Sequence, residues 1–176
     1  FMSLLNMGFL SEAIKEKNIE KPNDIFNYVR ERLITTIGDE GQKDGMDGIL
    51  IAVDKSKHRI EYCAANNEPI LIRDGEIIEL PKDKMPVGKG ERKESFTLHT
   101  LDLKVGDSLY LYTDGYADQF GGPKGKKFKY RKLNDILLGF NDKPLPDQRT
   151  ILETEFKDWK GAHEQVDDVL VVGIRI

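Results

Sequence analysis

Two acidic motifs lie beside apolar segments and have the chemistry to hold a metal ion. Asp114-Gly115 directly follows the segment SLYLYT, and Asp167-Asp168 directly precedes VLVVGIRI. Strands of a buried sheet hold the side chains at their ends rigidly, as a cation site requires. Carboxylates that lie close together attract Mg²⁺ or Mn²⁺, which prefer oxygen ligands. The pairs therefore indicate a divalent metal site. The alternative is that they are ordinary turn residues, since Asp and Asp-Gly are favoured there.

Nitrogen and sulfur ligands give no comparable pattern. The three histidines, His58, His99 and His163, lack the i, i+4 spacing of a zinc-binding helix. We therefore interpret them as structural, although His163 is close enough in sequence to Asp167 for a supporting role to stay open. Cys63 is the only cysteine, so the chain can form neither a disulfide framework nor a cysteine cluster.

Helical patterns open the chain. Apolar residues recur at helical spacing over residues 2–13, with no capping residue before them. A second amphipathic pattern covers residues 25–37, and we expect Asn23 or Asp24 to cap this helix and Gly38 to end it. Two helices are thus predicted ahead of the first strand.

The middle of the chain changes to the pattern of short strands joined by tight turns. Asp74-Gly75 is a hairpin signal within the third of them. Consecutive strands of this kind predict an antiparallel sheet. The predicted strands cover residues 48–53, 58–65, 70–80, 95–101 and 107–113.

A lysine-rich segment, GGPKGKKFKY at residues 121–130, is expected to form a loop. Helices are predicted over residues 131–140 and 146–160, and the apolar run at 169–176 is expected to be a central strand. The order of elements indicates an α+β layered architecture. No linker divides it, so residues 1–176 are predicted to form a single domain.

Composition excludes several classes of partner. The 27 basic and 31 acidic residues give a formal charge of −4, so no global field would gather nucleic acid. No apolar run approaches the ~20 residues that span a bilayer, and no membrane contact is expected. The single cysteine is typical of a reducing, cytoplasmic setting.

Four segments in order carry a family resemblance: CAANNEPILIRDG, DKMPVG, LYTDGYADQF and EQVDDVLVVGIRI. Together with FMSLLN at the start and KDGMDGILIAVD at residues 43–54, they resemble the SpoIIE/RsbU branch of PPM-type (type 2C-like) serine/threonine phosphatases. The resemblance extends over residues 1–176. It implies the α/β/β/α sandwich of that family, in which helices flank two antiparallel sheets.

Residue roles follow from the resemblance position by position. It implies that Asp114, with Gly115 beside it, is a ligand of a two-metal centre and that Asp167 is its partner from the last strand. Asp118 matches a position that holds an additional, weaker metal in some relatives. Asp168 is expected to orient its neighbour or to cap the turn.

The resemblance also implies the reaction and the partner. In this family, two Mn²⁺ or Mg²⁺ ions bridge a water or hydroxide that attacks the phosphorus of a phosphoserine or phosphothreonine in line. The substrate is often a phosphorylated regulatory protein of bacterial signalling, such as an anti-sigma-factor antagonist. A sensor domain usually precedes the phosphatase domain.

One departure from the family pattern limits the expected activity. The family's first Asp-Gly motif would lie just upstream of FMSLLN, so we interpret the chain as N-terminally truncated. We expect an incomplete binuclear site, no activity of the chain alone, and exposed sheet edges that favour a homodimer. The competing hypothesis is a non-catalytic module that binds phosphoproteins or oligomerises on the same scaffold.

Lys124, Lys126 and Lys127 are candidates for substrate binding, because local basic charge steers anionic partners. A solvated loop is the simpler interpretation, since lysines without arginine form no bidentate phosphate clamp. If the lysines do act, the resemblance places them in substrate docking.

Overall fold

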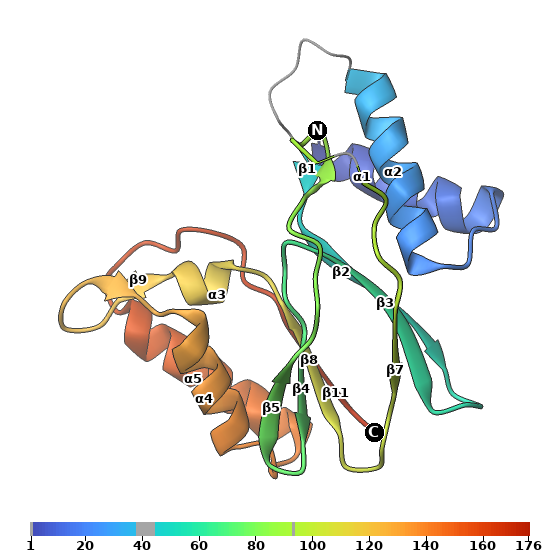
Figure 1. Ribbon diagram of the computed structural model, residues 1–176. Coiled ribbons are helices and arrows are strands. Elements are labelled where there is room, and N and C mark those ends of the chain that lie inside the picture. The colour runs from blue at the N-terminus through green and yellow to red at the C-terminus, as the bar shows by residue number, and fades with distance from the viewer. Residues whose placement is uncertain (1, 38–44, 93) are drawn as a thin grey trace. The chain divides into compact units, whose positions relative to one another are not determined.

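The computed structural model describes residues 2–37, 45–92 and 94–176 (Figure 1). They form two compact units. Unit 1 comprises Phe1–Glu68 and Pro81–Lys104, and unit 2 comprises Pro69–Leu80 and Val105–Ile176. Each unit contains one main antiparallel sheet with helices packed on it.

Unit 1 opens with helices that bury one apolar face. Helix α1 (Met2–Ser11) continues into a π-helical turn, η1 (Glu12–Glu16), and α2 (Pro22–Ile37) follows. Both predicted helices are thereby confirmed. Their core contacts come from side chains at helical spacing, which are Phe9, Ala13, Ile25, Phe26, Val29 and Leu33.

The predicted cap of the second helix was wrong. Helix α2 begins at Pro22, so Asn23 and Asp24 lie in its first turn, where Asn23 Nδ2 donates to Asp24 Oδ1 over 2.9 Å. Proline is favoured at the first helical position because its fixed φ already matches the helix and it needs no N–H partner there. The predicted stop at Gly38 lies outside the described residues, as do Lys43 and Asp44 of the quoted motif.

The main sheet of unit 1 has the strand order β2-β3-β7, all antiparallel. Its strands are β2 (Gly48–Asp54), β3 (Arg59–Ala65) and β7 (His99–Asp102), and a second pair joins β1 (Gly45–Met46) to β6 (Val87–Gly88). Strand β7 is shorter than predicted, because the N–H and hydroxyl of Thr97 donate to the carboxylate of Asp83 over 2.8 and 2.9 Å. Those bonds replace pairing with a neighbouring strand.

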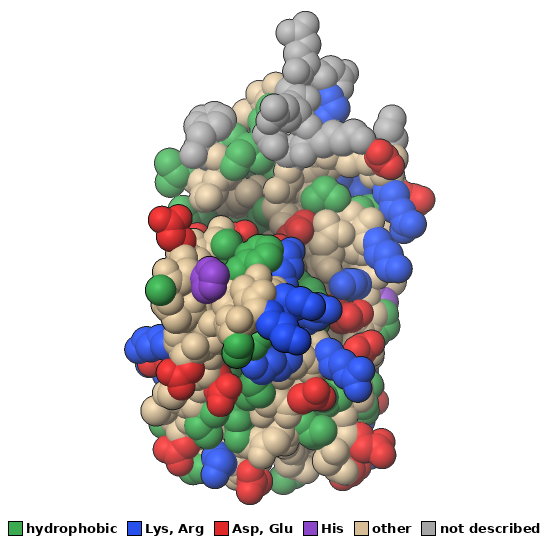
Figure 2. Space-filling model, turned by 90° about the vertical axis from the view of Figure 1, so that its left-hand side faces the viewer, with side chains coloured by type: hydrophobic (Ala, Val, Ile, Leu, Met, Phe, Trp, Pro, Cys, Tyr) green, Lys and Arg blue, Asp and Glu red, His purple; other side chains and the backbone are tan. Residues whose placement is uncertain are grey.

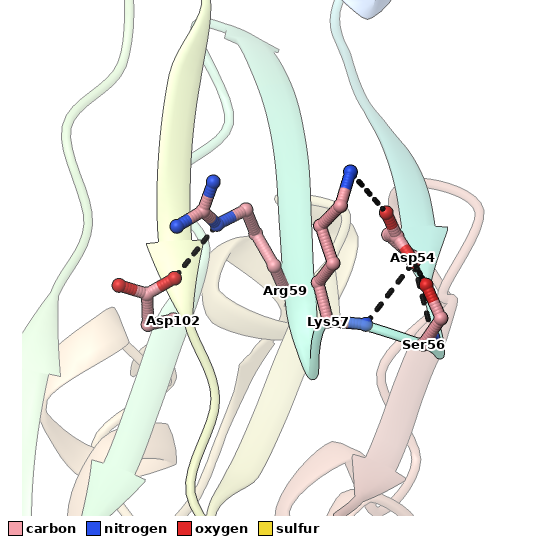
Figure 3. Close-up of polar contacts among 5 residues, drawn as sticks. All are labelled: Asp54, Ser56, Lys57, Arg59 and Asp102. Carbon is pink, nitrogen blue, oxygen red and sulfur yellow. Dashed lines mark hydrogen bonds and ion pairs between the residues drawn. The ribbon is translucent and has the colours of Figure 1, made fainter.

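The turn between β2 and β3 is held by one carboxylate (Figure 3). Asp54 Oδ1 accepts hydrogen bonds from the hydroxyl and N–H of Ser56 over 2.6 and 3.0 Å. Lys57 Nζ lies 3.2 Å from Asp54 Oδ2. One residue beyond the turn, Arg59 Nε donates across the sheet to Asp102 Oδ1 over 2.7 Å. The hydrogen bond from the Ser56 side chain, followed by that from Lys57, lowers the pKa of Asp54 to about 2.

This turn gives a pH-dependent stability prediction. The folded-state pKa of Asp54 is depressed from its ordinary 3.8 to about 2, so its contribution is complete above pH ~4 and is lost as the pH falls toward 2. We expect Asp54→Ala to lower the denaturation midpoint at neutral pH, and the gap to wild type to close over that range. Urea unfolding at several pH values measures it. A gap that stays constant with pH would contradict the prediction.

The sheet of unit 2 has the order β11-β8-β4-β5, again antiparallel throughout. Asp74 and Gly75 connect β4 to β5 with φ values of 54° and 78°, as a type I′ turn requires. The predicted hairpin is therefore confirmed. The four strands are β4 (Ile70–Arg73), β5 (Glu76–Glu79), β8 (Ser108–Tyr112) and β11 (Val171–Arg175).

The last strand does not take its predicted central place. Within the described residues, β11 pairs only with β8 and forms an edge of the sheet. Its apolar side chains are accordingly half-buried rather than enclosed, and Val172 is 38% exposed. A continuous apolar run usually indicates a strand covered on both faces, and this run is covered less completely.

Helices cover one face of that sheet (Figure 1). Helix α4 (Tyr130–Gly139) and helix α5 (Leu145–Lys160) match the predicted helices within one residue at all four ends. Leu133 and Leu137 of α4 and Leu152 of α5 pack with Tyr110 and Tyr112 of β8.

Three short elements connect β8 to α4. They are helix α3 (Gly115–Asp118), strand β9 (Phe120–Gly121) and strand β10 (Lys126–Lys127). The segment predicted as a loop is instead a small hairpin, in which β10 pairs with β9.

None of the helices in the described part of the chain has the length and apolar character needed to cross a membrane.

Candidate metal centre

Thr113 fixes the ends of two neighbouring strands in unit 2. Its N–H donates to the carbonyl of Leu170 over 3.0 Å. Its hydroxyl accepts from the N–H of Leu170 and donates to the carbonyl of Asp168, both over 3.0 Å. The chain just after β8 is therefore tied to the chain just before β11, which are the places of the two predicted acidic motifs.

Gly115 brings the two motifs into direct backbone contact. A Cβ on this residue would lie 2.3 Å from the carbonyl oxygen of Asp168 and 3.4 Å from the carbonyl carbon of Asp167. No side chain fits into that space, so glycine permits the approach. Two segments more than fifty residues apart in sequence thus meet at the positions of Asp114 and Asp167.

The two principal aspartates differ in their surroundings. Asp114 is half-buried and directly precedes α3, where its carbonyl accepts from the N–H of Asp118 over 2.8 Å. Asp167 is exposed, and its Oδ1 accepts from the N–H of Asp168 over 2.7 Å. The Gln165 side chain donates to the Asp167 carbonyl over 2.8 Å. Asp168 is itself exposed and contacts its neighbour through its backbone.

Asp118 is engaged by a cation from the β9–β10 hairpin. Lys127 Nζ lies 2.9 Å from Asp118 Oδ2, and both side chains are nearly half exposed. An exposed ion pair contributes little to stability. It does, however, place a positive charge where the sequence predicted an additional metal.

Gln119, which the sequence analysis did not single out, organises the neighbouring loop. Its side chain is fully buried. Its Nε2 donates to the carbonyl of Glu164 over 2.8 Å, and its Oε1 accepts from the N–H of Val166 over 3.3 Å. These bonds hold the segment leading into Asp167. Gln119 lies between Asp118 and Phe120 in the sequence, and no local pattern marks it as a buried residue.

Tyr116 anchors α3 on α5. Its hydroxyl donates to the Leu152 carbonyl over 2.9 Å, and its ring packs edge-on against Phe128 and Phe156 with centroid distances of 5.0 Å. Burial raises the pKa of Tyr116, so its hydroxyl stays protonated and serves as a structural donor. These contacts hold α3, the short helix that directly follows Asp114, in a fixed position on α5.

The side chains at this site have the chemistry that a hard divalent cation requires. Asp114 and Asp167 offer carboxylate oxygens, which Mg²⁺ and Mn²⁺ prefer. Among the residues that the structure describes, no group of three or more His, Cys, Asp and Glu side chains is arranged to hold a metal ion. Asp114 and Asp167 are therefore candidates for only part of a coordination shell.

The remaining candidates lie elsewhere. His99 stacks on Tyr62 with ring centroids 4.9 Å apart, His58 lies in the β2–β3 turn, and His163 lies in the loop after α5. Burial raises the pKa of the Cys63 thiol to about 12, so that thiol carries no nucleophilic character at neutral pH. Cys63 is buried in β3.

Comparison with solved structures defines the class of fold. The SiaA-PP2C domain of Pseudomonas aeruginosa is 26% identical, with a TM-score of 0.88 over 99% of this chain and 69% of that chain. The PP2C phosphatase domain of SpoIIE from Bacillus subtilis, solved with a fragment of its regulatory domain, is 21% identical, with a TM-score of 0.72. The RsbU and RsbW domains of a Mycobacterium tuberculosis protein are 16% identical, with a TM-score of 0.73.

Coverage of the second and third structures is partial: this chain is matched over 97% of its length in each case and spans 48% and 45% of those chains. The predicted fold class is confirmed, and the chain has the mixed helix and antiparallel-sheet fold of a PP2C-type phosphatase domain.

The family follows from the sequence itself. The family model described as "Stage II sporulation protein E (SpoIIE)" matches residues 2–176, so the chain belongs to the SpoIIE family. A search of curated protein sequences gives no match. The prediction that the whole chain is one domain stays a prediction.

Proposed function

We propose that this chain carries part of the catalytic centre of a Mn²⁺- or Mg²⁺-dependent phosphatase that removes phosphate from serine or threonine of a regulatory protein. The single observation that supports the proposal is the close approach of Gly115 to the backbone of Asp168, which brings the segments of the two acidic motifs together in unit 2. Membership of the SpoIIE family and the phosphatase domains of the same fold support the reaction class.

The residues of this chain would bind and orient the metal. Asp114 and Asp167 would donate carboxylate oxygens, Thr113 would fix the distance between their segments, and Gln119 would hold the loop that carries Asp167. When bound, Mn²⁺ or Mg²⁺ supplies Lewis-acid chemistry, because it lowers the pKa of water and neutralises charge on the phosphate. A related fold, that of RsbX, was solved in complex with magnesium.

Hydrolysis without a protein nucleophile agrees with the rest of the chain. The only cysteine, Cys63, is fully buried and has a pKa of about 12. A cysteine mechanism needs an accessible thiolate. Metal-assisted attack by water needs only the carboxylates and a held phosphate.

The described residues would form an incomplete centre. Two aspartates without a third ligand group bind a divalent ion weakly, since Mn²⁺ and Mg²⁺ sites usually combine more oxygen ligands. We therefore expect no turnover from residues 1–176 alone. Full activity would require further oxygen ligands from outside the described residues.

The setting that we propose is bacterial signalling in the cytoplasm, with a phosphorylated anti-sigma-factor antagonist or a similar small regulatory protein as substrate. The occurrence of an RsbU domain beside an RsbW domain in the Mycobacterium tuberculosis structure supports this class of partner. We propose no nucleic-acid or membrane partner for this segment, given its formal charge of −4.

The test is metal-dependent hydrolysis of p-nitrophenyl phosphate and of a phosphoserine peptide. It compares residues 1–176 with a chain that includes the residues encoded before Phe1. We expect hydrolysis by the longer chain only when Mn²⁺ or Mg²⁺ is added, and none after treatment with EDTA. A folded longer chain that binds Mn²⁺ yet hydrolyses neither substrate would refute the proposal.

The second candidate is a non-catalytic module that binds phosphoproteins or oligomerises. It is favoured by the pairing of Asp118 with Lys127 and by the absence of a third ligand group among the described residues. Against it, a scaffold without a metal has no physical need for two carboxylates that repel each other. Phosphopeptide binding without Mn²⁺ and without hydrolysis would select this candidate.

Self-association is the prediction attached to the edge strand β11. In the described residues the outer edge of β11 pairs with no strand, and Leu170 and Val172 are exposed beside it. Such edges template pairing with a second chain. We expect concentration-dependent dimers of residues 1–176 in the micromolar range by sedimentation velocity, and monomers for Val172→Lys, which charges the edge. A monomer mass at all concentrations would contradict this prediction.

A further inference from the structure

The β9–β10 hairpin and the start of α4 carry a dense group of cations. Residues 124–132 contain six Lys and Arg and no Asp or Glu. All but Lys132 are exposed. Figure 2, which views the molecule from the side of β9 in Figure 1, shows Lys and Arg side chains gathered beside hydrophobic ones. We call residues 124–132 the basic hairpin.

Four of these six cations have no side-chain partner among the residues that the structure describes. Lys127 pairs with Asp118, and Lys132 Nζ lies 3.9 Å from the ring centre of Trp159. The side chains of the other four form no hydrogen bond or ion pair with any residue that the structure describes: Lys124, Lys126, Lys129 and Arg131. Their charges are therefore available to an anionic partner.

The helix that follows does not account for the charges either. Arg131 lies in the first turn of α4, where no acidic residue is present. The N-terminus of a helix carries partial positive charge, so cations there are unfavourable and acids are preferred. Helix stability alone would therefore favour acidic rather than basic side chains at this position.

Lys129 has a strained backbone conformation. Its φ of 76° and ψ of 145° fall near a region that only glycine adopts readily, so a lysine held there strains the backbone. The conformation is enforced by its neighbours, because its N–H donates to the Ala117 carbonyl over 2.7 Å. Glycine would adopt this conformation without strain, so the presence of lysine indicates that its charged side chain has a role at this position.

The hairpin is held rigidly on α5. A Cβ on Gly121 would lie 1.8 Å from the Trp159 carbonyl oxygen, and the N–H of Gly122 donates to the same oxygen over 2.8 Å. Phe128 is buried and packs edge-on against Trp159 with ring centroids 5.2 Å apart. The cations are thus displayed from a preorganised support, which lowers the entropic cost of binding.

We propose that the basic hairpin is a docking surface for an acidic segment of a protein partner. Its four unpaired cations supply charge complementarity, and the exposed rings of Phe120 and Tyr130, 41% and 44% accessible, offer the aromatic contacts that enrich protein interfaces.

The partner is the phosphoprotein substrate itself, an assignment that rests on the proposed function. Lys127 of the hairpin touches Asp118, whose N–H donates to the Asp114 carbonyl. An acidic segment bound to the hairpin therefore lies next to the candidate metal centre. Docking of this kind raises the association rate and selects substrates by the charge around the phosphorylated residue.

The test uses a fluorescein-labelled peptide rich in Asp and Glu around one phosphoserine, followed by fluorescence anisotropy. The comparison peptide carries Asn and Gln in place of every acid. We expect the acidic peptide to bind at least tenfold more tightly at low salt, and the advantage to shrink as salt rises. The double variant Lys126→Glu/Arg131→Glu should lose that advantage. Lys21→Glu/Lys55→Glu in unit 1, which changes the net charge equally, should keep it.

Lys129→Gly separates the charge from the strain. This variant removes one cation and relieves the backbone, so it should bind the acidic peptide severalfold more weakly while its melting temperature rises. A lower melting temperature would overturn the strain argument for Lys129.

Several outcomes would overturn the proposal. Equal affinity for the acidic and amide peptides would do so, and so would equal losses in the two double variants. Tighter binding to oligothymidine or to phosphatidylserine vesicles would assign the hairpin to another partner. Hydrolysis of p-nitrophenyl phosphate by the longer chain in the presence of Mn²⁺ is scored separately. Its absence would refute the proposed function, whereas its presence without discrimination between the peptides would refute only the docking surface.

Discussion

Gly115→Ala is expected to destabilise the protein strongly and to abolish metal binding. The new methyl carbon would lie 2.3 Å from the Asp168 carbonyl oxygen and 2.9 Å from its carbonyl carbon. Both are backbone atoms that the hydrogen bond from Thr113 holds in place, so the chain must separate there. Overpacking of this kind costs about 3 kcal/mol. Urea unfolding measures the loss, and Mn²⁺-induced stabilisation of the melting temperature reports on the site.

Gly139→Ala provides the matched control in the same unit. Gly139 is the last residue of α4, and an added Cβ would meet no atom within 4 Å. We expect a change of at most about 0.5 kcal/mol, since exposed helical alanine is tolerated or preferred. If Gly115→Ala proved as mild as this control, the close backbone approach of the two motifs would be refuted.

Local patterns predicted the elements that carry strong local signals. Asp74-Gly75 supplies the two positive φ values that a type I′ turn needs, so the hairpin was readable without tertiary information. The apolar stripe of residues 25–37 likewise matches the buried face of α2. Both depend on neighbours in sequence, which is why they were predictable.

Errors arose where distant contacts decide the outcome. The run at 169–176 reads as a central strand, yet β11 is an edge in the described sheet because a pattern of apolar residues does not state how many neighbours a strand has. The lysine-rich segment reads as a loop, yet Lys126 and Lys127 pair with β9 because Phe128 and the two glycines pack on Trp159. Neither of these contacts can be recognised from the pattern of neighbouring residues in the sequence.

In the candidate site, too, the features set by local sequence were predictable and those set by distant contacts were not. Asp114 and Asp167 were selected by residue type and by their places at strand ends, and that selection remains a prediction about metal binding. What positions them was not readable. Thr113 and Gln119 act through hydrogen bonds to the carbonyls of Asp168 and Glu164, and those partners lie 55 and 45 residues away along the chain.

Charge at the site couples the metal centre to the basic hairpin. Lys127 neutralises Asp118, so a cation that binds at Asp118 must first displace this lysine. An acidic partner that draws Lys127 away would free the carboxylate. Metal binding at Asp118 and docking at the hairpin would then favour each other, and such coupling must act equally in both directions.

Asp114→Asn and Asp167→Asn are expected to lower metal affinity strongly without disturbing the backbone of the site. Each change keeps the shape of the side chain but removes one anionic ligand. Loss of outer partners of a metal ligand already lowers affinity 10–100-fold, so we expect a fall of about 100-fold or more in Mn²⁺ affinity by titration calorimetry, with a matching loss of hydrolysis in the longer chain.

Stability without metal distinguishes this role from a structural one. Asparagine keeps the shape of aspartate and an acceptor oxygen, so the metal-free variants should be about as stable as wild type, while the stabilisation produced by Mn²⁺ disappears. Asp74→Asn is the control, because Asp74 lies in the β4–β5 turn at φ 54°, a conformation that asparagine also tolerates. It should retain the full response to Mn²⁺. Should the two site variants keep that response as well, Asp114 and Asp167 are turn residues and the metal lies elsewhere.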